Sequence, residues 1–197
     1  KGLREWDVPG VCIAIVKDGK VVMTKAYGVA DVKTKKPVTL KTLFSIASVT
    51  KSFTAATAMV SAQQKKIDID IPLRQYFPDL QFYDEYATHN STMRDLLVHR
   101  SGIPREKFFS INPPTTRLQV RECLRYFEPT AGFREVFQYC NETYTVAGDM
   151  LGELHATTWE ALVNDFFLQP LHMNTTYFSF SKVPKNEHIA TPYIRRN

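Results

Sequence analysis

Ser48 and Lys51 are three residues apart in the segment Ser48-Val49-Thr50-Lys51, and a run of small and apolar residues follows them. On a helix this spacing places both side chains on one face, about one turn apart. A lysine amine can then reach the serine hydroxyl, and the partial positive charge of a helix N-terminus favours an anion at the serine. The pair is therefore a candidate nucleophile with an adjacent base.

The same four residues also have a simpler interpretation. Ser48 could be an N-cap or first-turn serine, with Lys51 on a solvated face of the helix. A second S-x-x-K runs from Ser179 to Lys182, precedes a proline and lies in no helical pattern. That second copy indicates how easily the motif arises by chance.

Three features of the surrounding sequence favour the catalytic interpretation. The apolar run TLFSIAS at 42–48 predicts that the start of the helix lies in a core, and the small residues of FTAATAMV at 53–60 allow close packing around the helix. Far downstream, Tyr139 and Asn141 stand at the entrance to another predicted helix. A tyrosine near a cation can share proton transfer, and an asparagine amide can hold an ester or amide substrate.

The elements that must position these residues are of two kinds. Two β-rich runs, 11–16 and 21–27, flank Asp18-Gly19 and predict a hairpin with a tight turn. From residue 48 the periodicity is helical, with helices expected over 48–64, within 91–103 and around 116–127, 142–155 and 159–171. Because a two-stranded hairpin is not stable alone, we expect other residues, within this chain or missing from it, to complete the sheet.

Two of these expectations concern helix ends and breaks. Ser91 or Thr92 would cap the short helix within 91–103, and Gly102 would close it before Pro104. The adjacent prolines of SINPPTT at 110–116 predict a loop, because proline breaks a helix.

Composition narrows the class of protein. A chain of 197 residues with 44% hydrophobic content predicts a globular protein with one good core or two small ones. The formal net charge of +5 is spread along the chain, and its densest cluster, at 33–36, is typical of a solvated turn, so we expect no nucleic-acid partner. No run approaches the roughly 18 apolar residues of a membrane span. The cysteines at 12, 123 and 140 and the histidines lack metal-ligand spacing, so no metal is expected.

Some residues that could be taken for functional ones have structural interpretations. His99 stands at the end of a predicted helix, where a hydrogen-bonding role is favoured over that of a general base. An aromatic stretch could line a substrate cleft or pack under a loop. Its members are Tyr76, Phe77, Phe82, Tyr83 and Tyr86. Trp159 and the pair Phe166-Phe167 are interpreted as core residues of the last helix.

Five segments, taken in order, resemble the landmarks of the serine β-lactamase and penicillin-binding-protein-like superfamily. Within this superfamily, the segments look like the branch that contains class C β-lactamases, family VIII carboxylesterases and D-amino-acid-specific peptidases. The segments are VPGVCIAIVKDGKVV at 8–22, TLFSIASVTKSFTA at 42–55, LLVHRSGIP at 96–104, YCNETYTVAGDMLGEL at 139–154 and WEALVNDFFLQPLHMNTTYF at 159–178.

The resemblance implies an α/β (α+β) fold of the β-lactamase/transpeptidase type, in which helices flank an antiparallel sheet and a mostly helical subdomain is added. Residues 1–45 would form the N-terminal helix and hairpin of the α/β subdomain. Residues 46–180 would form the mostly helical subdomain, and 181–197 would begin the return to the sheet.

The resemblance also implies a role for each candidate residue. Ser48 would be the nucleophile, Lys51 its general base or proton partner, Tyr139 the second proton-transfer group and Asn141 an anchor for the substrate amide or carbonyl. The reaction would be acyl transfer from an ester, amide or lactam, with the backbone N–H of Ser48 as half of the oxyanion hole. Neither a metal nor an organic cofactor would be needed.

The sequence departs from the superfamily pattern at two places. A third motif, of the Lys-Thr-Gly or His-x-Gly type, normally follows on a sheet strand that carries the other oxyanion donor, and it is not found here. We therefore expect the chain to be an N-terminal portion of a longer polypeptide, with the C-terminal sheet strands missing. Cys140 also replaces the commoner serine of the second motif, at a position expected to point away from the site.

Two hypotheses follow from the sequence. The first is a serine hydrolase or acyltransferase whose partners are a small ester, amide or lactam substrate and the remainder of the same polypeptide. The second is a non-catalytic β-lactamase-like binding or assembly module, or an inactive fragment, which the missing third motif favours. A homo-oligomer is compatible with both.

Overall fold

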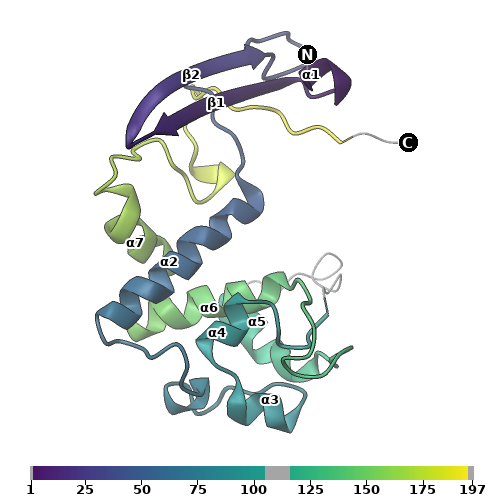
Figure 1. Ribbon diagram of the computed structural model, residues 1–197, viewed down its shortest axis with the longest axis vertical. Helices are drawn as coiled ribbons and strands as arrows, with labels where there is room; N and C mark the ends of the chain where they lie inside the picture. The colour runs from purple at the N-terminus through teal and green to yellow at the C-terminus, as the bar shows by residue number, and fades with distance from the viewer. Residues whose placement is uncertain (1, 105–115, 195–197) are drawn as a thin grey trace. The chain divides into compact units, whose positions relative to one another are not determined.

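The computed structural model describes residues 2–104 and 116–194 of the chain (Figure 1). The described residues divide into two units. Those up to Ala47 and from Thr175 onward form the hairpin unit, and those from Ser48 to Asn174 form the helical unit. The candidate residues Ser48, Lys51, Tyr139 and Asn141 all belong to the helical unit.

The strands and helices of the described residues follow the order expected for a mixed α/β chain. The strands are β1 (Gly10–Lys17) and β2 (Lys20–Gly28). The α-helices are α1 (Gly2–Glu5), α2 (Thr50–Gln63), α3 (Glu85–Asn90), α4 (Met93–Leu97), α5 (Arg117–Cys123), α6 (Asn141–Leu154) and α7 (Trp159–Val163). Shorter turns are η1 (Ala47–Val49), η2 (Leu73–Gln75), η4 (Leu124–Tyr126), η6 (Phe180–Lys182) and the π-helical η5 (Asn164–Leu168).

The predicted antiparallel hairpin is confirmed. β1 pairs with β2 from Gly10↔Gly28 to Lys17↔Lys20, which leaves a two-residue turn. Asp18 and Gly19 have φ values of 50° and 71°, the left-handed conformation that a type I′ hairpin turn requires at both positions.

Both faces of this hairpin leave apolar side chains exposed among the described residues. Ile15 and Val16 are neighbours on β1, so their side chains point to opposite faces, and they are 45% and 61% exposed. Among the described residues, the sheet consists of β1 and β2 alone. That further residues complete the sheet stays a prediction.

The helix predicted to begin at Ser48 starts later than expected. The sequence predicts one helix over 48–64, but Ser48 lies in the 3-10 turn η1, and α2 begins two residues later at Thr50. The last predicted helix, 159–171, is also wrong in its second half. It changes to π geometry at Asn164 and ends at Leu168, because the ring of Pro170 cannot follow a regular α-helical turn.

The short helix within 91–103 is present but ends earlier than predicted. It is α4, and Thr92 caps it through a capping box with Asp95. Gly102 does not close this helix: the helix ends at Val98, and His99 then turns the chain with a left-handed φ of 58°. The predicted loop at 110–116 lies outside the described residues except for Thr116, which caps α5.

The expectation that TLFSIAS seats the helix start in a core is wrong for the described residues. Phe44 and Ile46 are 39% and 44% exposed, and Ser48 is exposed as well. Apolar residues indicate that a segment favours burial, but they do not specify what covers it.

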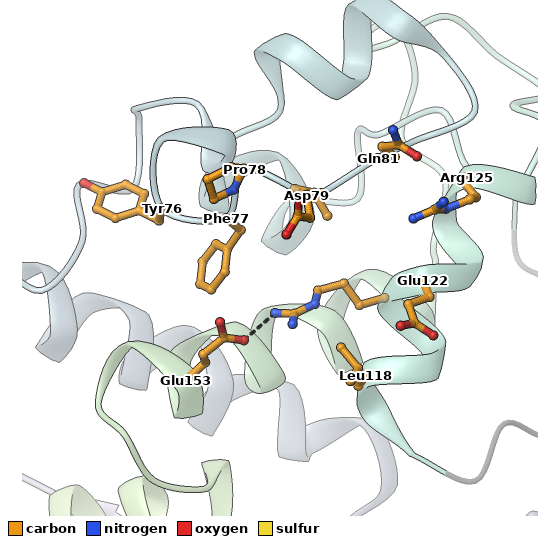
Figure 2. A pocket seen from close by; sticks show the side chains of 11 residues that line it. Tyr76, Phe77, Pro78, Asp79, Gln81, Leu118, Glu122, Arg125 and Glu153 are labelled. Atoms are coloured by element: carbon orange, nitrogen blue, oxygen red, sulfur yellow. Dashed lines mark hydrogen bonds and ion pairs between the residues drawn. The ribbon is translucent and has the colours of Figure 1, made fainter.

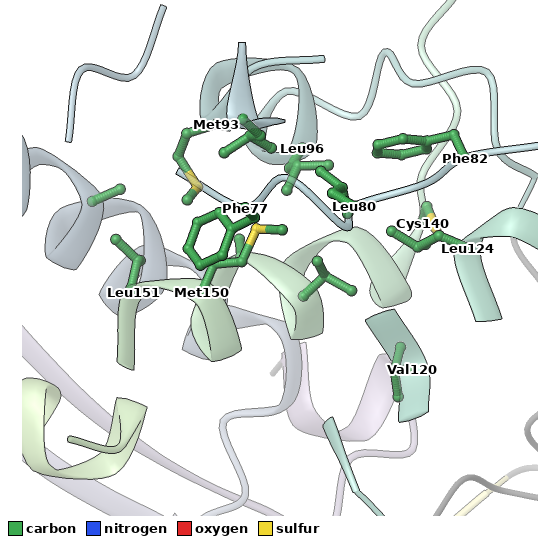
Figure 3. Packing of buried hydrophobic residues seen from close by; sticks show 14 of the residues in the cluster. Phe77, Leu80, Phe82, Met93, Leu96, Val120, Leu124, Cys140, Met150 and Leu151 are labelled. Carbon is green, nitrogen blue, oxygen red and sulfur yellow. The ribbon is translucent and has the colours of Figure 1, made fainter. Parts of the chain in front are cut away.

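The core of the helical unit forms where α6 packs against α2, α4, α5 and α7 (Figure 1). On α2 the side chains facing inward are small, with Thr57, Ala58 and Ser61 fully buried. Figure 3 shows larger side chains from α4, α5, α6 and the 77–82 segment meeting in one cluster. Its members include Phe77, Leu80, Phe82, Met93, Leu96, Val120, Leu124, Cys140, Met150 and Leu151.

An ion pair between a buried carboxylate and a half-exposed guanidinium holds α4 to the segment that leads into α6. The Arg134 guanidinium donates to both carboxylate oxygens of Asp95, at 2.7 and 2.6 Å, and Thr92 donates from its backbone and its hydroxyl to the same carboxylate. The Asp95 side chain is only 7% exposed. Burial alone would raise the pKa of Asp95, but the hydrogen bonds from Arg134 and Thr92 outweigh it, so the pKa lies below its usual value.

We expect Asp95→Asn to destabilise the protein by about 1 to 3 kcal/mol, because the amide nitrogen of asparagine cannot accept the hydrogen bonds that Arg134 and Thr92 donate to the buried carboxylate. The control is Asp70→Asn, which removes the ion pair of Asp70 with Arg94. Both of those side chains are more than half exposed, so we expect a much smaller loss than for Asp95→Asn. Urea denaturation at neutral pH measures both values. Equal losses for the two variants would contradict the prediction.

The same pair predicts a dependence on pH. A carboxyl whose pKa is lower in the folded state contributes stability at neutral pH and loses it as the pH falls. The contribution of Asp95 should therefore decline below about pH 4, where the unfolded carboxyl begins to bind protons, down through the lowered folded pKa. The stability difference between wild type and Asp95→Asn should shrink over the same range.

Candidate active site

The structure brings the four candidate residues together in one cluster. The Tyr139 hydroxyl donates to the Ser48 hydroxyl oxygen at 2.7 Å, and the Lys51 ammonium donates to Asn141 Oδ1 at 2.7 Å. The Lys51 Nζ atom also lies 4.7 Å from the centroid of the Tyr139 ring. Residues about 90 positions apart thus meet where α2 packs on α6.

The pairing within the cluster differs from the simplest reading of an S-x-x-K motif. In the described part of the chain the Lys51 ammonium bonds to Asn141 and not to Ser48. The partner of Ser48 in the described residues is Tyr139, whose hydroxyl donates to the serine oxygen. Lys51 lies between the phenol ring and the amide, where its charge acts on both.

The interpretation of Ser48 as a helix cap is wrong. The N-cap of α2 is Val49, which has no side-chain capping bond. Ser48 lies one residue earlier, directly after Ala47, whose φ of 42° is left-handed. Ser52, in the first turn of α2, does not cap the helix either, because its hydroxyl donates to the Val49 carbonyl at 2.7 Å.

The cluster is accessible in the described part of the chain. Ser48 and Asn141 are exposed, whereas Lys51 and Tyr139 are half-buried. The atoms that would meet a substrate therefore face solvent, while the groups that would move protons are held by packing.

Sequence reasoning missed Tyr144. It lies one helical turn after Asn141 on α6, and its hydroxyl donates to the Leu97 carbonyl at 2.8 Å. Its ring lies 5.3 Å from Lys51 Nζ, so two aromatic rings flank the ammonium. Burial, and then the neighbouring Tyr139, raise the pKa of Tyr144. The sequence offered one signal for this residue: Tyr144 is three positions after Asn141, so on a helix the two side chains share a face.

The second S-x-x-K has different surroundings. The sequence indicated no helical pattern at this second motif, but the structure has the 3-10 turn η6 there. Ser179 caps that turn, which favours its formation. The Ser179 hydroxyl bonds to Ser181 at 2.8 Å, and this short motif lies in the hairpin unit.

The aromatic stretch divides between the core and the surface. Phe77 and Phe82 are buried in the core, whereas Tyr83 and Tyr86 are exposed. Tyr76 and Phe77 also line a cavity of about 250 Å³ between the 76–81 segment and the 118–125 region, with Glu153 of α6 at one end (Figure 2). Arg121 and Glu153, which both line this cavity, form an ion pair at 2.8 Å, drawn as the dashed line in Figure 2. None of the four candidate residues lines this cavity.

Two further features of the described residues bear on other kinds of function. No group of three or more His, Cys, Asp or Glu side chains is placed to hold a metal ion within 2–104 and 116–194. In the same residues, no helix has the length and apolar character that crossing a membrane requires.

Cys140, which follows Tyr139, should be unreactive in the folded protein. Burial raises the pKa of its thiol to about 12, and the thiol donates to Glu142 Oε2 at 3.1 Å. At pH 8 its thiolate fraction should be more than about a thousandfold below that of a free cysteine. Iodoacetamide should therefore modify the exposed Cys12 in the native protein and Cys140 only after unfolding, as read by peptide mass spectrometry. Equal modification of both cysteines under native conditions would disprove this.

Comparisons with known proteins agree with the geometry. A sequence model of the Beta-lactamase family matches residues 2–195 of the chain. A curated relative, the unguisins hydrolase ungD' of Aspergillus campestris, is 33% identical over 203 residues, which cover 98% of this chain and 38% of the relative.

Two solved structures are also similar. The octameric penicillin-binding protein homologue from Pyrococcus abyssi has a TM-score of 0.83 and 29% identity, over 98% of this chain and 45% of that one. The D-amino acid amidase from Ochrobactrum anthropi SV3, in complex with L-phenylalanine amide, has a TM-score of 0.78 and 27% identity, over 96% of this chain and 53% of that one. The chain thus spans about two fifths to one half of the length of these relatives.

Proposed function

Since the chain belongs to the Beta-lactamase family, we propose that the protein is a serine hydrolase or acyltransferase that forms an acyl-enzyme on Ser48. The substrate would be an ester, an amide or a lactam. The observation that carries the proposal is the 2.7 Å hydrogen bond between the Tyr139 and Ser48 hydroxyls, with the Lys51 ammonium over the tyrosine ring.

In the first step the Ser48 oxygen bonds to the substrate carbonyl carbon, and the carbonyl π electrons move onto oxygen. For this step Tyr139 first loses its own proton to solvent, and the Lys51 ammonium stabilises the phenolate that results. The serine proton then passes to this phenolate, while Lys51 stays protonated beside it. When the tetrahedral intermediate collapses, the bond to the leaving alcohol or amine breaks and that group takes up the proton. Water or another acceptor then releases the acyl group by the same steps.

Asn141 would anchor the substrate. Its Oδ1 atom accepts from Lys51, which orients the amide so that its Nδ2 donors are available to a substrate carbonyl. The exposure of Asn141 and Ser48 on the described residues is consistent with both atoms meeting the same ligand. A hydrolase and an amidase among the similar proteins support hydrolysis and, of the three bond types, favour an amide.

The second candidate is a non-catalytic binding or assembly module of the same family. It is favoured by the octameric state of the homologue from Pyrococcus abyssi. In that case the hydrogen bond between Tyr139 and Ser48 would only join α6 to the start of α2.

Exposure to a fluorophosphonate distinguishes the two candidates. The serine oxygen attacks phosphorus and fluoride leaves, so an assembled nucleophile gains a stable mass adduct without a natural substrate. We expect one adduct, and peptide mass spectrometry should locate it on Ser48. An unmodified protein would reject the hydrolase and leave the binding module as the working function.

A further inference from the structure

We propose that His99 is a positioning residue for Tyr139. It binds the backbone on both sides of the tyrosine and packs against the phenol ring, so it sets where the phenol oxygen meets Ser48. This inference rests on the proposed function, because the position of Tyr139 matters to catalysis only if Ser48 is the nucleophile.

Two hydrogen bonds bracket Tyr139. The backbone N–H of Gln138 donates to the His99 carbonyl at 2.8 Å, and the backbone N–H of Cys140 donates to His99 Nδ1 at 3.2 Å. Between them, the imidazole and phenol rings lie 4.5 Å apart, centroid to centroid, at an angle of 34°. One residue thus holds the neighbour before Tyr139, the neighbour after it and the ring itself.

His99 is itself held firmly. It is 7% exposed, and its left-handed backbone directs the chain away from the end of α4. The residues that follow pair with the segment leading to Tyr139: Arg134 N–H donates to the Arg100 carbonyl at 2.8 Å, and Thr130 N–H donates to the Gly102 carbonyl at 3.2 Å. Because both sides are anchored, a change at His99 is transmitted to Tyr139 and not absorbed by a loose loop.

The hydrogen bond from Cys140 determines the protonation of the ring. A backbone N–H can only donate, so His99 Nδ1 must be an acceptor, and the single ring proton of the neutral imidazole lies on Nε2. Protonation of Nδ1 would place two donors face to face and break the bond. Burial, and then the Lys51 charge, lower the pKa of His99 and keep the ring neutral near pH 7.

The titratable groups around the ring come from three parts of the helical unit. They are Lys51 of α2, Tyr144 of α6, and Tyr139 and Cys140 of the connecting segment, with Glu142 bonded to the Cys140 thiol. Among these, Lys51 is the one whose charge opposes protonation of His99. The ring therefore acts through Tyr139 as a neutral hydrogen-bond acceptor.

The test compares His99→Asn with His99→Ala in fluorophosphonate labelling of the protein. The Oδ1 atom of asparagine occupies about the place of Nδ1 and can accept from Cys140, and asparagine tolerates a left-handed φ. We expect His99→Ala to slow labelling of Ser48 by about tenfold to a hundredfold, because the phenol oxygen is displaced. His99→Asn should recover most of the rate. Thermal melting of both variants separates this effect from a loss of folding.

A second measurement determines the protonation state of the His99 ring and does not depend on activity. Nitrogen NMR of the histidines should show His99 with its proton on Nε2 at pH 7 and a pKa below about 6.5, the usual value for histidine. A proton on Nδ1 would overturn the inference. So would folded His99→Ala protein that labels at the wild-type rate while the proposed function stands. If wild type does not label at all, the proposed function fails and the catalytic role of His99 fails with it.

Discussion

Replacing Ser48 with alanine should abolish fluorophosphonate labelling and slow the turnover of an ester substrate by about a millionfold, as when the nucleophile of a serine protease is removed. The serine oxygen is the atom that forms the new bond, so no neighbouring group can substitute for it. Ser48 is exposed and is not the cap of α2, so the change should alter unfolding free energy by less than about 1 kcal/mol. Intact mass spectrometry and urea denaturation of one preparation measure both effects.

Two other serines provide matched controls for this variant. Ser52→Ala removes a hydroxyl one turn further along α2 that bonds only to the Val49 carbonyl, and Ser179→Ala removes the serine of the second S-x-x-K. Both variants should label like wild type. If Ser48→Ala keeps its adduct, or if Ser179→Ala loses it, the nucleophile has been assigned to the wrong motif.

The cluster was predictable because residue types and family landmarks agreed. Ser48, Lys51, Tyr139 and Asn141 were proposed from the sequence, and the structure brings them within hydrogen-bonding or ring contact. The hairpin was predictable for a local reason. Asp18-Gly19 is among the few pairs that favour a left-handed conformation at both turn positions.

What sequence did not predict depends on contacts between distant segments. The motif spacing suggested that Lys51 bonds to Ser48, but the partner of Lys51 is Asn141, which a different helix supplies. Tyr144 was missed because its role depends on α6 packing beside α2, which no local pattern reports.

Helix ends show the same limit. Glycine is the residue expected after a helix, so Gly102 was chosen as the end of α4, yet His99 adopts the left-handed conformation there. The left-handed conformation of His99 is unfavourable by itself, but the hydrogen bonds that its carbonyl and its ring make to the two neighbours of Tyr139 offset that free-energy cost. A local rule failed at this position because tertiary hydrogen bonds outweighed local preference.

The second large effect should come from Tyr139→Phe, which removes only the hydroxyl that bonds to Ser48. The phenyl ring retains its contact with Lys51 and its packing on His99, so the surrounding geometry should persist. We expect labelling of Ser48 to slow by about a hundredfold to ten-thousandfold, the usual contribution of a positioned acid or base.

The control for Tyr139→Phe is Tyr76→Phe. The Tyr76 hydroxyl makes a hydrogen bond too, in which it accepts from Asp68 N–H at 2.9 Å, but it lies at the separate cavity and outside the cluster. Labelling of Tyr76→Phe should match wild type, and both variants should stay folded by circular dichroism. If Tyr139→Phe labels at the wild-type rate, the phenol does not take the serine proton. Lys51 would then have to leave Asn141 and reach Ser48 directly, and Tyr139 would serve only as a ring beside that cation.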